Sequence, residues 1–206
     1  MTAPSTGAAV VAVDGRTARR DRNRDLVLDA VIELFTEDQF APNAAAVAER
    51  SGVSLRSVYR YFQDHDALVR AAIARNAERI APLFNVPDLG KGPLDERVTR
   101  FVAWRIRLYQ EEAPVARAAI VRAPANLILR DQLENVRALL RKQNVAMFAP
   151  ELAMMTTTQR RAVTAAIDTL LQFESAEHLI RRLDLSPAQT ADVLGRALTS
   201  LLTNPT

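Results

Sequence analysis

The chain has 206 residues, 49% of them hydrophobic, so it is long enough for one large core or two smaller ones and does not have the composition of a disordered protein. It has no cysteine and only two histidines, which excludes disulfides, cysteine nucleophiles and zinc sites rich in these residues; we expect no metal and no cofactor. The net charge is +3, no secretory signal is evident and no apolar run reaches the roughly 18 residues of a membrane span, so we expect a cytoplasmic protein without a membrane partner.

Residues 1–20 are predicted to form a flexible basic arm. Residues 1–15 lack helical periodicity, whereas residues 16–24 contain five arginines and one aspartate. Such a charge run suits contact with the phosphates of nucleic acid, with Arg19 and Arg20 as candidates. The alternative is a solvated tail without a partner.

Four helices are expected next, from apolar residues at helical spacing and from capping residues in front of them. They cover 22–38 (stopped by Pro42), 44–51 (capped by Asn43), 55–62 (capped by Ser54) and a stretch from His65 (capped by Asp64) to the residues before Pro82.

Residues 82–93, with three prolines and two glycines, are the clearest linker. The pattern is helical from there on. The expected helices are 94–112, a short one from Pro114, one from Pro124 to Met147, a long one over 158–182, and a last one from Pro187, capped by Ser186, to about Leu202. The predicted fold class is all-α with about nine helices, a smaller domain over 21–73 and a larger one over 74–206.

The second and third helices have the spacing of a helix-turn-helix. Ala48 is small where the two helices cross, and Gly52 tolerates the positive φ that the turn needs. Val47, Val53 and Phe62 can point at one core, which leaves the third helix free to enter a DNA major groove.

At 100° per residue the third helix has two faces. Leu55, Val58 and Phe62 fall on the face predicted to pack on the core, and Arg56 and Arg60 fall on the opposite face. The alternative is that both arginines are only solvated surface.

Arg56 is the best candidate for reading a base, because its planar fork can pair bidentately with guanine. The hydroxyl groups of Ser57 and Tyr59 are suited to hydrogen bonds with DNA phosphates. The complete set of expected DNA contacts is Arg56, Ser57, Tyr59, Arg60, Tyr61, Asn43, His65, Arg19 and Arg20.

The segment AVAERSGVSLRSVYRYFQDHDALV resembles the DNA-binding domain of tetracycline-repressor (TetR) family transcription regulators. The residues that carry the resemblance are Val47-Ala48, Ser51-Gly52-Val53-Ser54, Tyr59-x-Tyr61-Phe62 and Leu68, and it covers about residues 22–73. It implies a homodimer that binds a pseudo-palindromic operator in double-stranded DNA, and a helical second domain whose small-molecule effector releases the operator. Departures from the pattern are Gln39, where Gly is frequent, Ala44–Ala46, where polar residues are frequent, and His65, where Lys is common.

A ligand pocket in the larger domain is expected to be mostly apolar with few polar anchors. Arg105 could pair with Glu174 or bind an acidic ligand. Core packing is the alternative for every apolar candidate. The candidates are Phe101, Trp104, Arg105, Leu108, Tyr109, Leu140, Asn144, Met147, Ile167, Leu171 and Glu174.

The last two helices are the expected dimer interface, as a four-helix bundle. Their alternative role is to cover the subunit's own core. Apolar residues at helical spacing are Val163, Ile167, Leu170 and Leu171 on one helix, and Val193, Leu194, Leu198, Leu201 and Leu202 on the other.

The predicted function is a DNA-binding transcriptional regulator, a repressor released by a small, largely apolar ligand. The alternatives are a regulator that needs no ligand and a helix-turn-helix module for protein contacts. An all-α enzyme is not favoured, and we name no catalytic residue, because the sequence has no nucleophile elbow, phosphate-binding loop or metal-ligand spacing.

Overall fold

A computed structural model describes residues 15–37, 39 and 42–204. The described part is helical throughout, without a strand, which confirms the all-α class. Its elements are α1 (Gly15–Thr36), α2 (Ala44–Ser51), α3 (Leu55–Tyr61), α4 (His65–Ile80), η1 (Ala81–Phe84), α5 (Leu94–Arg122), η2 (Ala123–Ala125), α6 (Leu127–Met147), α7 (Ala149–Ala153), α8 (Thr157–Leu170), α9 (Phe173–Glu177), the π-helical turn η3 (His178–Arg182) and α10 (Pro187–Thr203).

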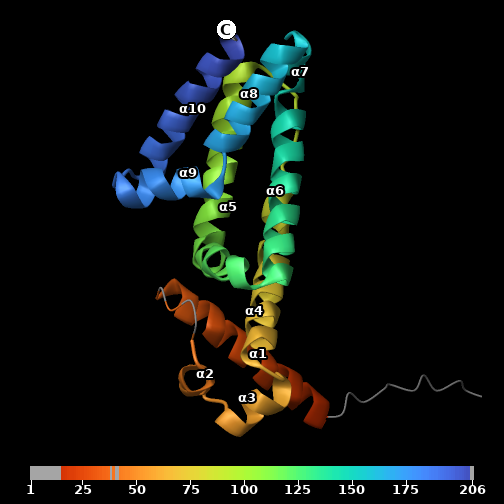
Figure 1. Cartoon of the computed structure of the whole chain (residues 1–206), viewed down its shortest axis with the longest axis vertical. Helices are drawn as coiled ribbons and strands as arrows, with labels where there is room; N and C mark the ends of the chain where they lie inside the picture. Colours follow the sequence, from red (N-terminus) through yellow and green to blue (C-terminus); the bar gives the residue numbers. More distant parts are fainter. Residues whose placement is uncertain (1–14, 38, 40–41, 205–206) are drawn as a thin grey trace, which may run out of the picture.

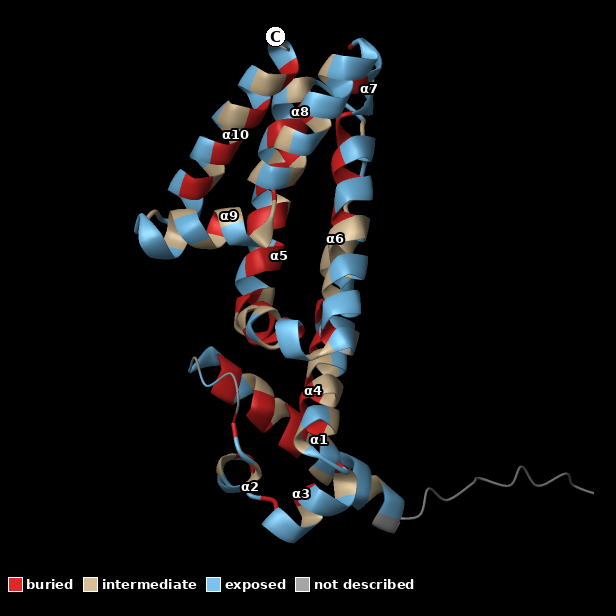
Figure 2. Ribbon diagram, in the orientation of Figure 1, coloured by how far each residue is buried: buried red, intermediate tan, exposed pale blue. Residues whose placement is uncertain are grey.

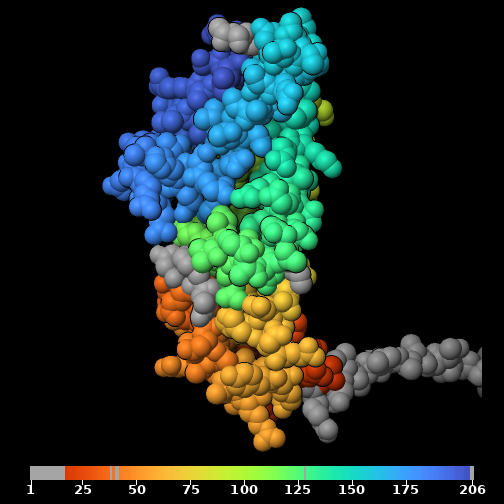
Figure 3. Space-filling model, viewed as in Figure 1, coloured from red at the N-terminus to blue at the C-terminus, as the bar shows by residue number. Residues whose placement is uncertain are grey.

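The molecule is elongated, with the first three helices at one end and the later helices at the other (Figure 1). α4 leads from the N-terminal end towards a bundle in which α5, α6, α8 and α10 run roughly side by side. The space-filling view shows the same division, since α1–α3 and α8–α10 occupy opposite ends of the surface (Figure 3). The helix-turn-helix is therefore presented at one tip of the molecule.

A first buried cluster holds the N-terminal end together. It unites apolar side chains of α1, the α2–turn–α3 unit and the first half of α4, including Phe35, Val47, Val58 and Phe62. Val115 and Ala118 of α5 belong to the same cluster. The boundary that we expect at residues 73 and 74 lies inside the continuous helix α4.

Two further clusters fill the bundle. One joins the first half of α5 with α7, α8 and α10, and the other joins the end of α4 with α5, α6 and α9. Figure 2 shows the buried residues on the faces that the helices turn towards one another. The burial follows the amphipathic pattern, because each helix has one apolar stripe to remove from water.

Several helices differ from the prediction in their extent. α1 begins at Gly15 rather than near Arg22, so residues 15–20 of the expected flexible arm are helical, while residues 1–14 lie outside the described residues. Residues 15–22 contain no proline and several helix-favouring arginines, which explains the extension. A short helix, α7, also stands where we expect only a break, because Pro150 occupies its first turn.

Pro114 does not end a helix. It lies inside the 29-residue helix α5. A proline removes one helical hydrogen bond, but Ala113, Val115 and Ala116 around it are all buried, and this packing holds the helix together.

The predicted long helix over 158–182 is instead interrupted between α8 and α9. Carbonyl groups at the end of α8 receive hydrogen bonds from outside the helix: the Ser175 hydroxyl donates to the Thr169 carbonyl at 2.6 Å, and the Tyr109 hydroxyl donates to the Leu171 carbonyl. These bonds satisfy groups that a continuing helix would have used.

Candidate functional site

The helix-turn-helix forms as its sequence predicts. Asn43 caps α2, its Oδ1 accepting from the Ala46 N–H at 2.9 Å, and the Ser54 hydroxyl caps α3 by accepting from the Ser57 N–H at 3.3 Å. Gly52 has a φ of +66°, a left-handed conformation that favours glycine. The caps and the turn glycine therefore define where α2 ends and α3 begins.

The outward face of α3 carries Arg56, Tyr59 and Arg60, all exposed. Tyr59 is 63% exposed, and Arg56 makes no hydrogen bond or ion pair with any described residue. The placement of Leu55 on the core face is wrong: this side chain is 41% exposed, because as the first residue of α3 it lies at the edge of the core. It adds an apolar group beside Arg56.

Arg60 is held in place by its neighbours, in contrast to Arg56. Its Nη2 donates to the Ser57 hydroxyl at 3.2 Å and to the Tyr61 hydroxyl at 3.3 Å. The guanidinium also lies 5.2 Å from the centre of the Tyr61 ring. Ser57 and Tyr61 thus orient Arg60, while Arg56 stays available for a partner.

Arg19 and Arg20 are exposed on the first turns of α1. This end of α1 lies at the same tip of the molecule as α3 (Figure 1). Arg24 connects the two helices, because its guanidinium lies 5.3 Å from the centre of the buried Phe62 ring. The basic segment is thereby fixed beside the helix-turn-helix.

His65, at the start of α4, faces the end of α5. Arg122 Nη1 lies 3.2 Å from His65 Nε2, and Arg122 Nη2 donates to Asp66 at 2.6 Å. Burial and the positive charge of Arg122 lower the pKa of His65, and Asp66 and Asp64 oppose this only in part. A neutral His65 therefore joins α4 to α5. It also borders an open hollow of about 370 Å³ that Asn43 and Tyr59 line.

Two cavities lie in the bundle and share part of their walls. The larger, about 270 Å³, lies between α4, α5 and α6, and the smaller, about 40 Å³, lies between α5, α6 and the junction of α8 with α9. Both are lined by Glu112, Ala116, Leu133 and Val136.

Only some of the side chains that we expect around a ligand lie at a cavity. Tyr109, Leu140, Leu171 and Glu174 line the smaller cavity, so the structure brings these four together. The others are packed elsewhere: Phe101, Met147 and Ile167 in the second core cluster, Leu108 in the third, Trp104 with its Nε1 donating to the Leu83 carbonyl at 2.6 Å, and Arg105 bonded to Asn144.

Arg105 is almost fully buried and does not pair with Glu174. Its Nη2 donates to Asn144 Oδ1 at 3.1 Å, and its guanidinium lies 4.9 Å from the centre of the Phe101 ring. Glu174 instead accepts from Arg137 at 2.6 Å. Arg105 is thus held by an amide and an aromatic ring.

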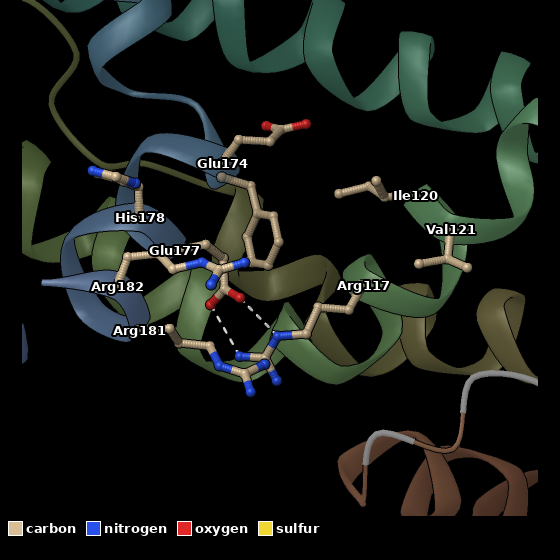
Figure 4. A pocket seen from close by; sticks show the side chains of 9 residues that line it. Arg117, Ile120, Val121, Glu174, Glu177, His178, Arg181 and Arg182 are labelled. Carbon is tan, nitrogen blue, oxygen red and sulfur yellow. Dashed lines mark hydrogen bonds and ion pairs between the residues drawn. The ribbon is translucent and has the colours of Figure 1, made fainter. Parts of the chain in front are cut away.

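An open groove of about 680 Å³ lies between the last turns of α5 and the α9–η3 segment. Arg117 crosses it and donates to both carboxylate oxygens of Glu177, at 2.7 and 2.9 Å (Figure 4). Arg181, Arg182 and His178 extend along the same wall (Figure 4). The groove is basic at its rim, but a full ion pair occupies its centre.

The helix-turn-helix and the helices around it are similar to a known protein family. Residues 27–72 match the family described as "Bacterial regulatory proteins, tetR family". They include the α3 face described above and all of the first buried cluster except Val115 and Ala118 of α5. Residues 27–72 of the chain therefore carry the tetR-family segment.

Two relatives of this chain carry the name "HTH-type transcriptional repressor KstR". The one from Rhodococcus jostii is 35% identical over 107 residues, which are 52% of this chain and 49% of that protein. The one from Mycolicibacterium smegmatis is 30% identical over 110 residues, 53% of each. The chain thus matches about half the length of these relatives.

Solved structures share the fold. A tetR-family transcriptional regulator from Streptomyces coelicolor has a TM-score of 0.70 at 19% identity, covering 90% of this chain and 82% of that one. A transcriptional regulator from a Rhodococcus species has a TM-score of 0.69 at 18% identity, covering 87% and 96%. At these identities the likeness concerns the fold alone.

The departures from the TetR pattern have structural counterparts. Gln39 lacks the conformational freedom of the glycine that is frequent at this position. The turn after α1 closes nevertheless, because the Leu34 carbonyl accepts from the N–H groups of both Glu37 and Gln39, at 3.2 and 3.0 Å. His65, where lysine is common, meets Arg122. A lysine in this position would place two positive charges together.

Glu112 and Arg122 are prominent in the structure but are not among the predicted site residues. Glu112 follows Glu111 just before Pro114 and has the sequence signal of a surface carboxylate. Arg122 lies 57 residues from His65 in the chain. In the described part of the chain no three acidic or histidine side chains gather as a metal site requires, and no helix has the length and apolar character to span a bilayer.

Proposed function

We propose that this protein is a TetR family transcriptional regulator that binds an operator through α3 and represses transcription. The observation that carries the proposal is the outward face of α3, where an unpartnered Arg56 stands beside an oriented Arg60 on a helix whose other face is buried. The family match and the repressor names of two relatives support it.

The two arginines have different proposed roles. Arg56 lies in the first turn of α3, where side chains reach base edges, and its fork suits guanine. Arg60 is held by Ser57 and Tyr61, so it suits a fixed phosphate. Arg19 and Arg20 on α1 would add phosphate contacts at the flank, in place of the residues that Ala44–Ala46 do not supply.

We further propose that the active form is a homodimer built on α8 and α10, bound to a pseudo-palindromic site. Val163, Ile167 and Leu171 of the expected interface are buried in the subunit's own core. The faces left for a partner are the small residues Ala162, Ala165 and Thr169 on α8, and on α10 Val193 and Leu201.

The effector site that we propose is the pair of cavities between α4 and α9. A ligand there would contact α4 and α5 at once. These helices meet again where Arg122 contacts His65 and Asp66, next to α3. Displacing α5 against α4 would therefore move the DNA-reading helix, which supports release of the operator by a small molecule.

The proposal is tested with operator fragments selected from genomic DNA and fluorescence anisotropy. The double variant Arg56→Ala, Arg60→Ala should lose operator affinity, since one bidentate base contact contributes about 1–3 kcal/mol, or about 5- to 150-fold. The slope of log K against log salt should also become shallower by about one for each phosphate contact removed.

The matched control is Arg107→Ala, Arg130→Ala, which removes the same charge from exposed positions on α5 and α6. It should leave affinity nearly unchanged. If both double variants lose affinity equally, general charge rather than α3 binds the DNA, and the proposed interface is wrong. Unchanged operator binding by the α3 variant would show that Arg56 and Arg60 do not contact the DNA. A chain that binds no selected operator would favour a helix-turn-helix used for protein contacts.

A further inference from the structure

We propose that the effector of this regulator is an organic cation whose ammonium group pairs with Glu112 in the cavity between α4, α5 and α6. The inference rests on the proposed function, in which these cavities hold the effector. It adds the ligand's charge and the residue that recognises it.

The position of Glu112 is the first argument. Its side chain borders both cavities, so it stands where their walls meet. The larger cavity, about 270 Å³, approaches the lower end of the range of about 300–1,000 Å³ for small-molecule sites. A ligand with one aromatic ring and a short chain fits that space.

The wall around Glu112 is the second argument. Most of the residues that line the larger cavity are apolar, among them Ile73, Phe84 and Leu129, and three carry neutral amides. Glu112 is the one charged residue among the described residues of this lining. An anionic ligand would find no positive charge on this wall, whereas a cation would find a carboxylate.

The missing partner of Glu112 is the third argument. Neighbouring carboxylates are paired: Glu111 with Arg79 at 3.2 Å, Glu174 with Arg137 at 2.6 Å, and Asp168 with Arg141 at 3.3 Å. Glu112 makes no hydrogen bond or ion pair with any described residue.

Burial raises the pKa of Glu112 to about 7, and the positive charge of Arg105 opposes this shift only in part. Arg105 is already held by Asn144 and Phe101. An unpaired charge in such a site is costly, so without a cation the carboxyl is favoured in its protonated form, whereas a bound cation would favour the carboxylate. Binding of an ammonium group should therefore release a proton near neutral pH.

Three probes of similar size test the charge: 4-phenylbutylammonium, 4-phenylbutanol and 4-phenylbutyrate, each titrated calorimetrically into the full chain. The ammonium should bind at least tenfold more tightly than the other two. Its affinity should fall about tenfold from pH 8 to pH 6. The reason is that the ionised fraction of Glu112, with a pKa of about 7, falls about tenfold over this interval.

The Glu112→Gln variant should bind the ammonium at least tenfold more weakly and lose the pH dependence. Glu96→Gln, the same change at an exposed position near the start of α5, should behave like the wild type. Circular dichroism establishes that both variants are folded before titration.

The proposal is overturned if the alcohol or the carboxylate binds as tightly as the ammonium, if Glu112→Gln binds the ammonium like the wild type, or if no probe binds. Operator binding by the wild type, measured without a probe, separates a failure of this inference from a failure of the proposed function. A wild type that binds operator but prefers no cation refutes this inference alone, and one that binds no operator refutes the proposed function.

Discussion

At the scale of single residues, the contact between His65 and Arg122 links the two halves of the molecule. The pKa of His65 is lowered in the folded state by burial and by Arg122, from an ordinary value of 6.5. The unfolded chain therefore binds a proton first as the pH falls. Stability contributed by this group is present above pH 6.5 and is lost as the pH falls towards the lower folded pKa.

The variant Arg122→Met should reduce that pH dependence, because it removes the positive charge beside His65 while keeping much of the buried stem. We expect the His65 pKa, measured by NMR, to rise towards 6.5, and the free energy of unfolding to vary less between pH 7 and pH 5. An unchanged His65 pKa would show that Arg122 does not act on it.

Glu112 gives a second prediction that needs no ligand. Its pKa is raised to about 7, so the unfolded chain loses this proton first, and stability falls as the pH rises from 4.5 to 7. The variant Glu112→Gln should raise the free energy of unfolding at pH 8 by about 3 kcal/mol at most, with little gain at pH 4. Urea unfolding at both pH values measures this; destabilisation at pH 8 would contradict a carboxyl without a partner.

At the scale of elements, the turn between α2 and α3 depends on backbone conformation rather than on space. A Cβ at Gly52 would meet no atom within 4 Å, but the φ of +66° strains any other residue. The variant Gly52→Ala should therefore destabilise the protein by about 1–2 kcal/mol.

Gly195 in α10 provides the control for this prediction. Its added Cβ would lie 3.6 Å from Val98 Cγ1, an ordinary contact, and its backbone is helical. The variant Gly195→Ala should therefore stabilise the protein by about 0.5–1 kcal/mol. Thermal and urea unfolding compare the two, and equal effects would contradict the role assigned to the turn.

These elements also show what the sequence can predict. The caps Asn43, Ser54 and Asp64 and the turn at Gly52 act on groups within three or four residues, so their signals are local. The continuation of α5 through Pro114 depends on packing against other helices, which no local signal carries.

The same distinction applies to the candidate sites. The outward face of α3 follows from helical periodicity, but Leu55 is exposed because the core ends there. The break after α8 requires Tyr109, which lies 62 residues from Leu171, and the burial of Glu112 requires three other helices. Such features emerge only when the helices assemble.

At the scale of the whole molecule, dimer formation should set operator affinity, because a two-fold site needs two α3 helices at a fixed separation. Val193 on α10 is 42% exposed, on the face that we propose for the partner. The variant Val193→Glu would bury a carboxylate at that interface. We expect monomers at micromolar concentration in analytical ultracentrifugation, and a large loss of affinity for the full operator.

Val145 offers a control for Val193, because it is 43% exposed and lies on α6, outside the two helices of the proposed interface. The variant Val145→Glu adds the same charge at the same exposure and should leave a dimer that binds operator normally. Dissociation by both variants would point to general destabilisation, and dissociation by Val145→Glu alone would move the interface to α6. A dimer that survives Val193→Glu would exclude this face of α10, since an unpaired carboxylate there would oppose association.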